Sequence, residues 1–207
     1  FVDRLLINDS RIDSMISSIK EIIQFKDPVG EINGIKEMPS GIKVGKMSMP
    51  LGVIAMIYES RPNVTIDASA LCIKSGNSII LRGGSESIFT NIVLAECIKN
   101  ALLKNNRNEN VVQLIDNTDR DIVNELLKQN NYIDIVIPRG GKNLIKLVDD
   151  LSSIPVLKHL DGICHVFIDR DADIKKAIKI AVNSKTQRTG VCNCLLYTSP
   201  SPRDRFL

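Results

Sequence analysis

The chain has 207 residues, of which 43% are hydrophobic and 25% are charged, a composition typical of a globular protein with a sizeable core. Its 27 basic and 24 acidic residues give a net charge of +3, which is too balanced to indicate a nucleic-acid partner. The longest apolar stretch, Met47 to Tyr58, has twelve residues. A membrane span needs about 20, so we expect no membrane anchor.

The five cysteines are scattered along the chain. An odd number without regular spacing is not the pattern of a disulfide framework, and it favours a reducing compartment. We therefore expect a cytoplasmic protein.

Hydrophobic spacing predicts the first elements of the chain. Apolar residues recur every three or four positions from Ile12 to Phe25, which predicts a helix that ends before Asp27-Pro28-Val29-Gly30. Alternation of apolar and polar residues predicts a half-exposed strand over 42–47. The continuous apolar run over 51–58 is typical of a strand covered on both faces.

Strands and helices alternate along the rest of the chain. We predict helices over 64–74, 85–104, 119–129, 142–151 and 172–183, and strands over 78–81, 111–115, 133–137, 155–157 and 165–168. Short apolar strands between longer helices are typical of an α/β fold with an open, largely parallel sheet. Ligands bind such sheets beyond the carboxyl ends of the strands, so the turns there are the candidate sites.

Two of these turns carry paired glycines next to an arginine, Arg82-Gly83-Gly84 and Arg139-Gly140-Gly141. Glycines let a ligand approach the backbone, the following helix offers N–H groups, and an arginine suits phosphate oxygens. Each pair could equally form a tight structural turn. The presence of two, both with arginine, favours an anionic nucleotide as the ligand.

A polar loop over 186–193 delivers Cys192. A cysteine thiolate is well suited to attack an acyl carbon near neutral pH, and Arg188 could lower the pKa of the thiol if it lies nearby. Alternatively, Cys192 is inert. We expect Cys72 and Cys97, which lie in helical apolar patterns, to be inert, and Cys164, beside a strand, to be packed.

The loop after the strand over 51–58 contains Arg61 and Asn63. The amide of Asn63 could stabilise an oxyanion and Arg61 could hold an anionic substrate group, but a plain turn explains these residues as well. We expect no metal site, because Cys164, His165, Cys192 and Cys194 match no usual zinc spacing.

The composition changes near residue 194. Residues 1–194 contain 30 Ile, 16 Lys and 17 Asn, whereas residues 195–207 contain none of the three. A Ser/Pro-rich linker would account for the change. We prefer the interpretation that residues 195–207 are a translated sequencing adapter and carry no function.

Together these segments resemble the gamma-glutamyl phosphate reductase family of the aldehyde dehydrogenase superfamily. The matching strings, in the family's order, lie at 27–30, 49–53, 57–65, 71–77, 80–84, 137–141, 162–165, 185–188 and 192–193. The resemblance implies a Rossmann-like fold of the aldehyde dehydrogenase type that is truncated at both ends. It implies a dinucleotide-binding domain over 1–185, with part of an oligomerisation strand near 42–50, and the start of a catalytic domain over 186–194.

The resemblance also implies an activity in proline biosynthesis, the NADPH-dependent reduction of L-glutamyl 5-phosphate to L-glutamate 5-semialdehyde with release of phosphate. Cys192 then matches the nucleophile that forms a thioester, and Asn63 the oxyanion-stabilising residue. Arg61 and Arg188 would bind substrate, and the two Arg-Gly-Gly turns would border NADPH or NADP.

The family implies a homo-oligomer, with glutamate kinase as a further partner. Other readings of the chain stay open: the reductase half of a fused glutamate kinase–reductase, an aldehyde-oxidising enzyme, or a non-catalytic dinucleotide-binding module. We expect the 207-residue chain alone to be inactive.

Overall fold

The computed structural model describes residues 5–59, 61–158, 164–187 and 194–195, and the chain divides into two compact units. The first unit runs from Phe1 to Lys158 and the second from His159 to Leu207. The predicted dinucleotide-binding domain over 1–185 therefore covers the first unit and part of the second. Its ligand stays a prediction.

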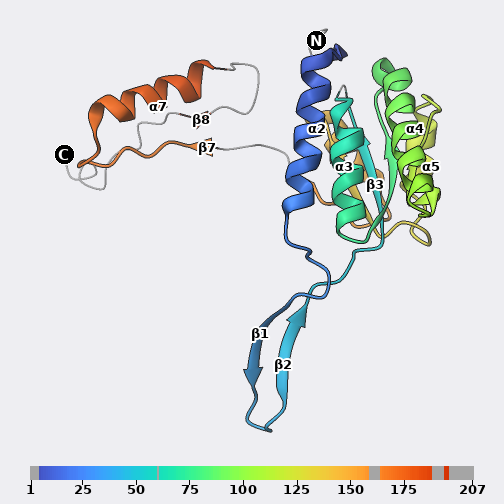
Figure 1. Cartoon of the computed structure of the whole chain (residues 1–207), viewed down its shortest axis with the longest axis horizontal. Coiled ribbons are helices and arrows are strands. Elements are labelled where there is room, and N and C mark those ends of the chain that lie inside the picture. Colours follow the sequence, from blue (N-terminus) through green and yellow to red (C-terminus); the bar gives the residue numbers. More distant parts are fainter. Residues whose placement is uncertain (1–4, 60, 159–163, 188–193, 196–207) are drawn as a thin grey trace. The chain divides into compact units, whose positions relative to one another are not determined.

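A four-stranded parallel sheet forms the centre of the first unit (Figure 1). Its strands lie in the order β5 (Val112–Leu114), β4 (Ser78–Arg82), β3 (Val53–Tyr58) and β6 (Ile135–Arg139). The predicted open, parallel α/β sheet is thereby confirmed.

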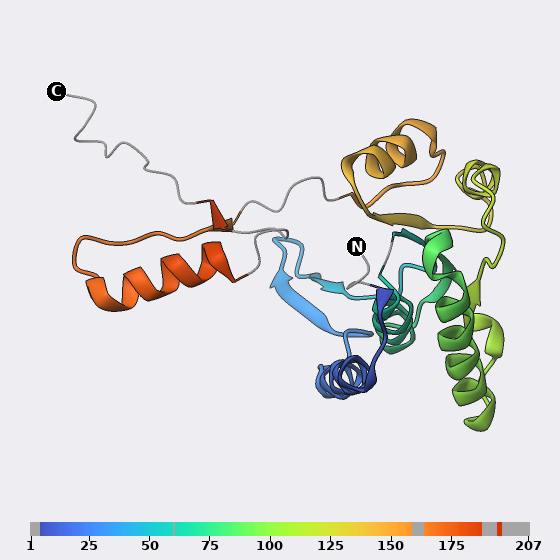
Figure 2. The ribbon, with the colours of Figure 1, turned by 90° about the horizontal axis from the view of Figure 1, so that it is seen from above.

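Helices cover both faces of this sheet, as the view in Figure 2 shows for α3 and α6. The helices of the first unit are α2 (Asp9–Gln24), α3 (Asn63–Lys74), α4 (Ile88–Lys104), α5 (Asp121–Leu126) and α6 (Lys142–Leu151). Helices α3 and α4 share a core with one face, and α5 and α6 share a core with the other. Helix α2 packs against α3.

Successive side chains of a strand point to opposite faces of the sheet, so each strand contributes residues to both cores in turn. In β3, Ile54 and Tyr58 are buried on the α3 and α4 side, and Ala55 and Ile57 on the α5 and α6 side. The predicted strand over 51–58 is apolar throughout because both of its faces are covered.

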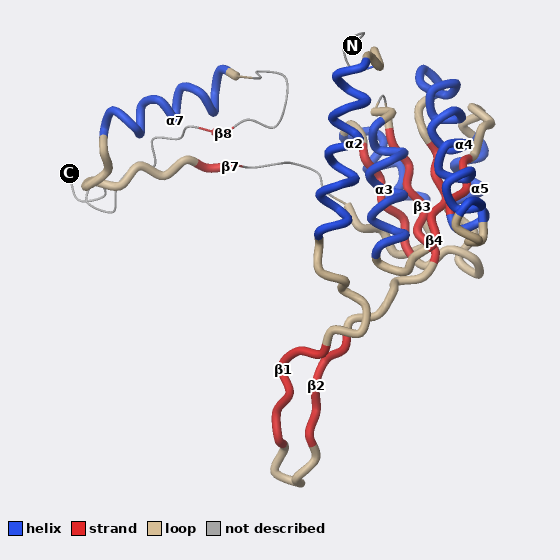
Figure 3. Tube along the Cα trace, viewed as in Figure 1, coloured by secondary structure: helices blue, strands red, loops and turns tan. Residues whose placement is uncertain are grey.

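Strands β1 (Ile32–Glu37) and β2 (Lys43–Met47) form a separate antiparallel ribbon, drawn in red in Figure 3. No strand was predicted over 32–37, so β1 was missed. A half-exposed strand was predicted over 42–47, but every residue of β1 and β2 is exposed.

Strand β6 begins and ends two residues later than predicted. It includes Pro138, and among the described strands β6 pairs with β3 alone. On its other side Val136 forms an isolated bridge with Val156, so the predicted strand over 155–157 is reduced to that bridge. Pro138 lies two residues beyond Val136, so the N–H that proline lacks would have pointed away from β3.

Several predicted helices differ from the structure at their ends, and α2 begins three residues earlier than predicted. The segment Ser85–Ser87 is a 3-10 turn, and α4 begins only at Ile88. A second 3-10 turn, Glu109–Val111, precedes β5. Helix α5 stops at Leu126 instead of residue 129.

The second unit contains α7 (Ile174–Thr186) and the parallel pair β7 (Cys164–His165) and β8 (Cys194–Leu195). The side chain of Asp173 caps α7 by accepting a hydrogen bond from the Lys176 N–H at 3.2 Å. Strand β7 is shorter than the predicted strand over 165–168, and β8 includes Leu195, the first residue of the predicted tail. Residues 196–207 lie outside the described part of the chain.

Within the described ranges, the structure contains no helix that is both long and apolar enough to cross a bilayer.

The core on the α3 and α4 side allows a test of the fold. Leu81 in β4 is fully buried there, so Leu81→Ala should lower the free energy of unfolding by about 2–5 kcal/mol, as large-to-small core substitutions do. Urea unfolding followed by circular dichroism measures the change. Leu103→Ala on the exposed side of α4 is the matched control, with an expected change within about 0.5 kcal/mol. Equal effects of both substitutions would contradict the packing.

Candidate functional site

Three predicted site segments follow adjacent strands that end at the same level. The parallel register places Arg82 of β4 beside Ile57 of β3, and Arg139 of β6 beside Tyr58. The two Arg-Gly-Gly turns and the loop with Asn63 therefore lie along one edge of the sheet, at the carboxyl ends of its strands. This edge is where open parallel sheets bind ligands.

The guanidinium of Arg82 is turned into the protein. It is 9% exposed, and its Nη1 and Nη2 donate to the carbonyls of Gly83 at 2.7 Å and Thr118 at 2.9 Å. Its buried Nε has no hydrogen-bond partner in the described part of the chain. Burial lowers the pKa of this guanidinium, while the nearby carboxylate of Glu86 opposes the shift. Arg82 thus links the end of β4 to the loop that follows β5.

Packing alone requires glycine at position 83. A Cβ there would lie 2.2 Å from Nδ2 of Asn91 and 3.1 Å from the ring of Tyr58. Both neighbours are buried, so neither can move away easily. The atoms nearest to a Cβ on Gly84 would be those of the Glu86 carboxylate, the end of an exposed side chain, at 2.7 Å.

A chain of buried polar groups connects the β3–α3 loop region to the Gly83–Gly84 turn. Tyr58 Oη lies 2.7 Å from Thr65 Oγ1, which donates to Asn91 Oδ1 at 3.2 Å. Asn91 Nδ2 donates to Ser87 Oγ at 3.2 Å, and Ser87 Oγ donates to the Gly84 carbonyl at 3.3 Å. These contacts were not predicted from the sequence, where the one signal was polar residues within otherwise apolar helices.

At the second Arg-Gly-Gly turn, the carboxylate of Glu59 takes the place that an anion would use. Its Oε2 accepts a hydrogen bond from the Gly141 N–H at 2.9 Å, at the beginning of α6. The backbone N–H of Glu59 also donates to the Arg139 carbonyl at 3.1 Å. Negative charge is favourable at a helix N-terminus, so Glu59 stabilises this turn.

Asn63 is the first residue of α3, and its amide faces a carboxylate. Asn63 Nδ2 donates to Asp67 Oδ2 at 3.1 Å, and Asp67 Oδ1 accepts from Ser18 of α2 at 2.9 Å. The backbone carbonyl of Arg61 accepts from the Val64 N–H at 3.0 Å in the turn before α3. The predicted pair thus lies at the start of one helix.

The cysteines differ in their surroundings. Burial raises the pKa of Cys72 to about 11, which keeps its thiol protonated and agrees with the expected inert role. Cys97, predicted to be inert, is exposed on α4. The predicted nucleophile Cys192 and the predicted substrate ligand Arg188 lie outside the described residues. Among the described residues, no group of three metal-ligating side chains comes together.

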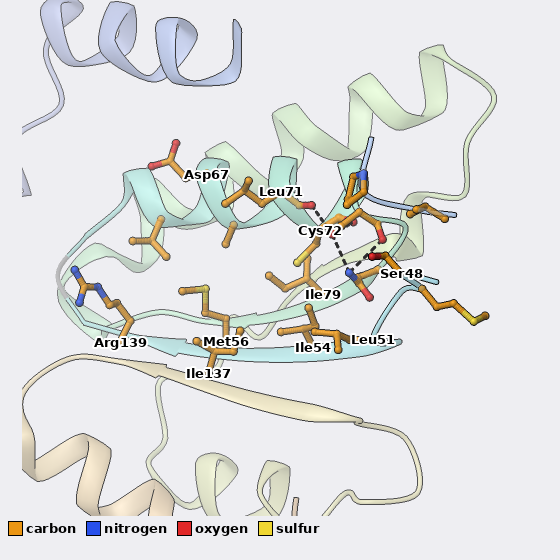
Figure 4. Close-up of a pocket in the computed structure, with 17 residues that line it drawn as sticks. Ser48, Leu51, Ile54, Met56, Asp67, Leu71, Cys72, Ile79, Ile137 and Arg139 are labelled. Carbon is orange, nitrogen blue, oxygen red and sulfur yellow. Dashed lines mark hydrogen bonds between the residues drawn. The ribbon is translucent and has the colours of Figure 1, made fainter. Parts of the chain in front are cut away.

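A largely apolar cavity of about 430 Å³ lies between α3 and the sheet (Figure 4). Met56 and Ile137 contribute to its floor, and Leu71 and Cys72 of α3 line the opposite side. Polar groups are few, and Asp67 and Arg139 lie toward one end. Local sequence patterns do not predict this cavity, because its lining comes from segments far apart in the chain.

Comparison with known proteins identifies relatives for almost the whole chain. The sequence model of the aldehyde dehydrogenase family matches residues 7–197. A gamma-glutamyl phosphate reductase of Ruthia magnifica subsp. Calyptogena magnifica is 54% identical over 192 residues, which are 93% of this chain and 46% of that protein. The predicted resemblance is confirmed.

Solved structures agree with the fold. The gamma-glutamyl phosphate reductase of Thermotoga maritima matches with a TM-score of 0.83 and 45% identity, covering 92% of this chain and 46% of that one. The Saccharomyces cerevisiae enzyme of the same name matches with a TM-score of 0.66 and 37% identity, covering 89% and 47%. The chain spans about half the length of these relatives.

The contacts of Gly83 generate a prediction about stability. Gly83→Ala should lower the free energy of unfolding by about 1–3 kcal/mol, because the new methyl group overpacks against Asn91 and Tyr58. The control is Gly141→Ala, where the nearest atom would be 3.9 Å from the Cβ and the change should stay within about 0.5 kcal/mol. Urea denaturation measures both variants. A neutral Gly83→Ala would show that the turn has room for a side chain.

The buried phenol of Tyr58 predicts a loss of stability at alkaline pH. Burial raises the pKa of Tyr58 to about 12, above its usual 10.0. Between pH 10 and 12 the unfolded chain loses this proton while the folded chain keeps it, so stability falls as the pH rises. By pH 11 the loss should be about 1 kcal/mol.

Urea unfolding at pH 9 and pH 11 measures this loss. Tyr58→Phe should remove it, whereas Tyr132→Phe, at a 73% exposed tyrosine, should retain it. An identical pH dependence in the two variants would contradict the prediction.

Proposed function

Because the chain belongs to the aldehyde dehydrogenase family, we propose that the protein carrying it is a nicotinamide-dependent reductase of an acyl phosphate. Its substrate is L-glutamyl 5-phosphate and its products are L-glutamate 5-semialdehyde and phosphate, a step of proline biosynthesis. The observation that carries this proposal is the 54% identity to a gamma-glutamyl phosphate reductase over 93% of the chain. The three candidate segments at one sheet edge support it.

The residues at this edge fit a dinucleotide. Gly83 and Gly84 offer a turn without side chains, and the buried Nε of Arg82 has no hydrogen-bond partner in the described part of the chain. Gly140 and Gly141 precede the ten-residue helix α6, and there a cofactor phosphate would have to replace the Glu59 carboxylate that now accepts from the Gly141 N–H. We assign the Arg82–Gly84 and Arg139–Gly141 turns to NADPH or NADP, which when bound supplies or accepts hydride.

Cys192 is the nucleophile of the proposed reaction. Its thiolate forms a bond with the acyl carbon of glutamyl phosphate while the bond to the phosphate oxygen breaks, and phosphate leaves with the electron pair. The thioester that results is reduced at the same carbon, and the thiolate is then released as the aldehyde forms. Arg188, four residues earlier, favours the thiolate form of Cys192.

Asn63 and Arg61 act on the substrate in this proposal. The carboxamide of Asn63 has two N–H bonds, and its bond to Asp67 uses one of them in the described part of the chain. The other can donate to the oxyanion that forms when the acyl carbon becomes tetrahedral. Arg61 and Arg188 bind the anionic groups of glutamyl phosphate.

Assembly and location follow the same proposal. We assign residues 42–50 to an oligomerisation strand of a homo-oligomer. The exposed apolar side chains of the β1–β2 ribbon support that role: Ile32, Ile35, Ile42, Val44 and Met47. Glutamate kinase is the proposed protein partner, and the proposed location is the cytoplasm.

The reverse reaction tests the function in the full-length protein. Glutamate semialdehyde should reduce NADP only when phosphate is present. The absorbance of NADPH measures the reaction. Cys192→Ala should abolish turnover and retain NADPH binding, because only the nucleophile is removed. Cys97→Ala, at an exposed cysteine of α4, is the control and should keep wild-type activity.

The possible outcomes separate the proposed reductase from other functions. Phosphate-independent NADP reduction would indicate an aldehyde-oxidising enzyme, and cofactor binding without turnover would indicate a non-catalytic module. An active Cys192→Ala protein would remove Cys192 from the mechanism.

A further inference from the structure

We propose that the buried hydrogen-bonded chain of Tyr58, Thr65, Asn91 and Ser87 is a positioning network that fixes the Gly83–Gly84 turn for cofactor binding. This inference rests on the proposed function, because it takes that turn as part of the dinucleotide site. The four side chains come from β3, α3, α4 and the 3-10 turn before α4. All four are at most 4% exposed, so water does not replace their bonds.

The donors and acceptors of the network permit one direction only. Asn91 Nδ2 donates to Ser87, so the Asn91 atom that faces Thr65 is the acceptor Oδ1. The single hydroxyl proton of Thr65 goes to that oxygen, and Tyr58 must therefore donate to Thr65. Ser87 in turn gives its proton to the Gly84 carbonyl. Each hydrogen bond between these side chains thus has one donor and one acceptor, and the network ends on the Gly84 carbonyl of the turn.

The network acts together with Arg82 on the orientation of two peptide planes. Arg82 Nη1 binds the Gly83 carbonyl at 2.7 Å, and Ser87 Oγ binds the Gly84 carbonyl at 3.3 Å. A trans peptide is planar, so fixing each carbonyl also fixes the N–H on its opposite side. The N–H groups of Gly84 and Ser85 therefore point away from these side chains. The Ser87 N–H also donates to the Gly84 carbonyl at 3.2 Å, so the Ser87 hydroxyl adds a second bond to the plane after Gly84, and Arg82 holds the plane after Gly83.

Contact with the turn adds a second constraint. The ring of Tyr58 and the amide of Asn91 occupy the space where a side chain of Gly83 would lie. The same two residues thus pack against the turn and hydrogen-bond to Thr65. Losing one hydroxyl of the network should loosen the turn and weaken cofactor binding without removing a group that contacts the reacting atoms.

Steady-state kinetics of the full-length enzyme test this role. Thr65→Val and Ser87→Ala should each raise the KM for NADPH about five- to tenfold, the effect of losing one hydrogen bond, and leave kcat within about twofold. Thr65→Ser, which keeps the hydroxyl, should restore the KM. Should Thr65→Val fail to fold, Ser87→Ala at the end of the network provides the same test.

The matched control is Ser69→Ala. Ser69 is 1% exposed in α3, and its hydroxyl donates to the Thr65 carbonyl at 2.6 Å, outside the network. Its removal should lower the melting temperature as Ser87→Ala does but leave the KM for NADPH unchanged. A KM that stays at the wild-type value in Thr65→Val and Ser87→Ala would overturn the positioning role while the proposed function stands. A wild-type enzyme without NADPH-dependent activity would overturn both.

Discussion

The parallel pairing of β3 with both neighbours controls the rest of the first unit. Its register sets Ile57 beside Arg82 and Tyr58 beside Arg139, so three strands end at one level. A slip of one residue would exchange the faces of β3 and place Ala55 in the opposite core. Burial on both faces prevents such a slip, because each face meets a different pair of helices. The candidate site is thus a consequence of strand register.

The sequence predicted the central sheet well because its strands carry strong local signals. Continuous apolar runs and glycine-rich turns identify β3 and β4 without knowledge of the tertiary contacts. The β1 segment, Ile32–Glu37, lacks such a signal, since it contains glycine, asparagine and two charged residues. It is a strand only because β2 pairs with it, and pairing partners cannot be identified from one segment alone.

For the candidate site, the sequence predicted the positions of the turns but not what their side chains do. Both arginine–glycine turns suggested open phosphate sites. In the structure Arg82 donates to the carbonyl of Thr118, 36 residues away. The Gly141 N–H donates to the carboxylate of Glu59, 82 residues earlier. Likewise, Thr65 and Asn91 meet across 26 residues. Such contacts depend on the three-dimensional arrangement of strands and helices, which local spacing does not encode.

Pro138 affects backbone hydrogen bonding along the outer edge of β6. Beyond the bridge between Val136 and Val156, the outer edge of β6 presents a proline where another residue would offer a backbone donor. Pro138 is itself buried, and proline has no backbone N–H that would need a partner at this point inside the protein.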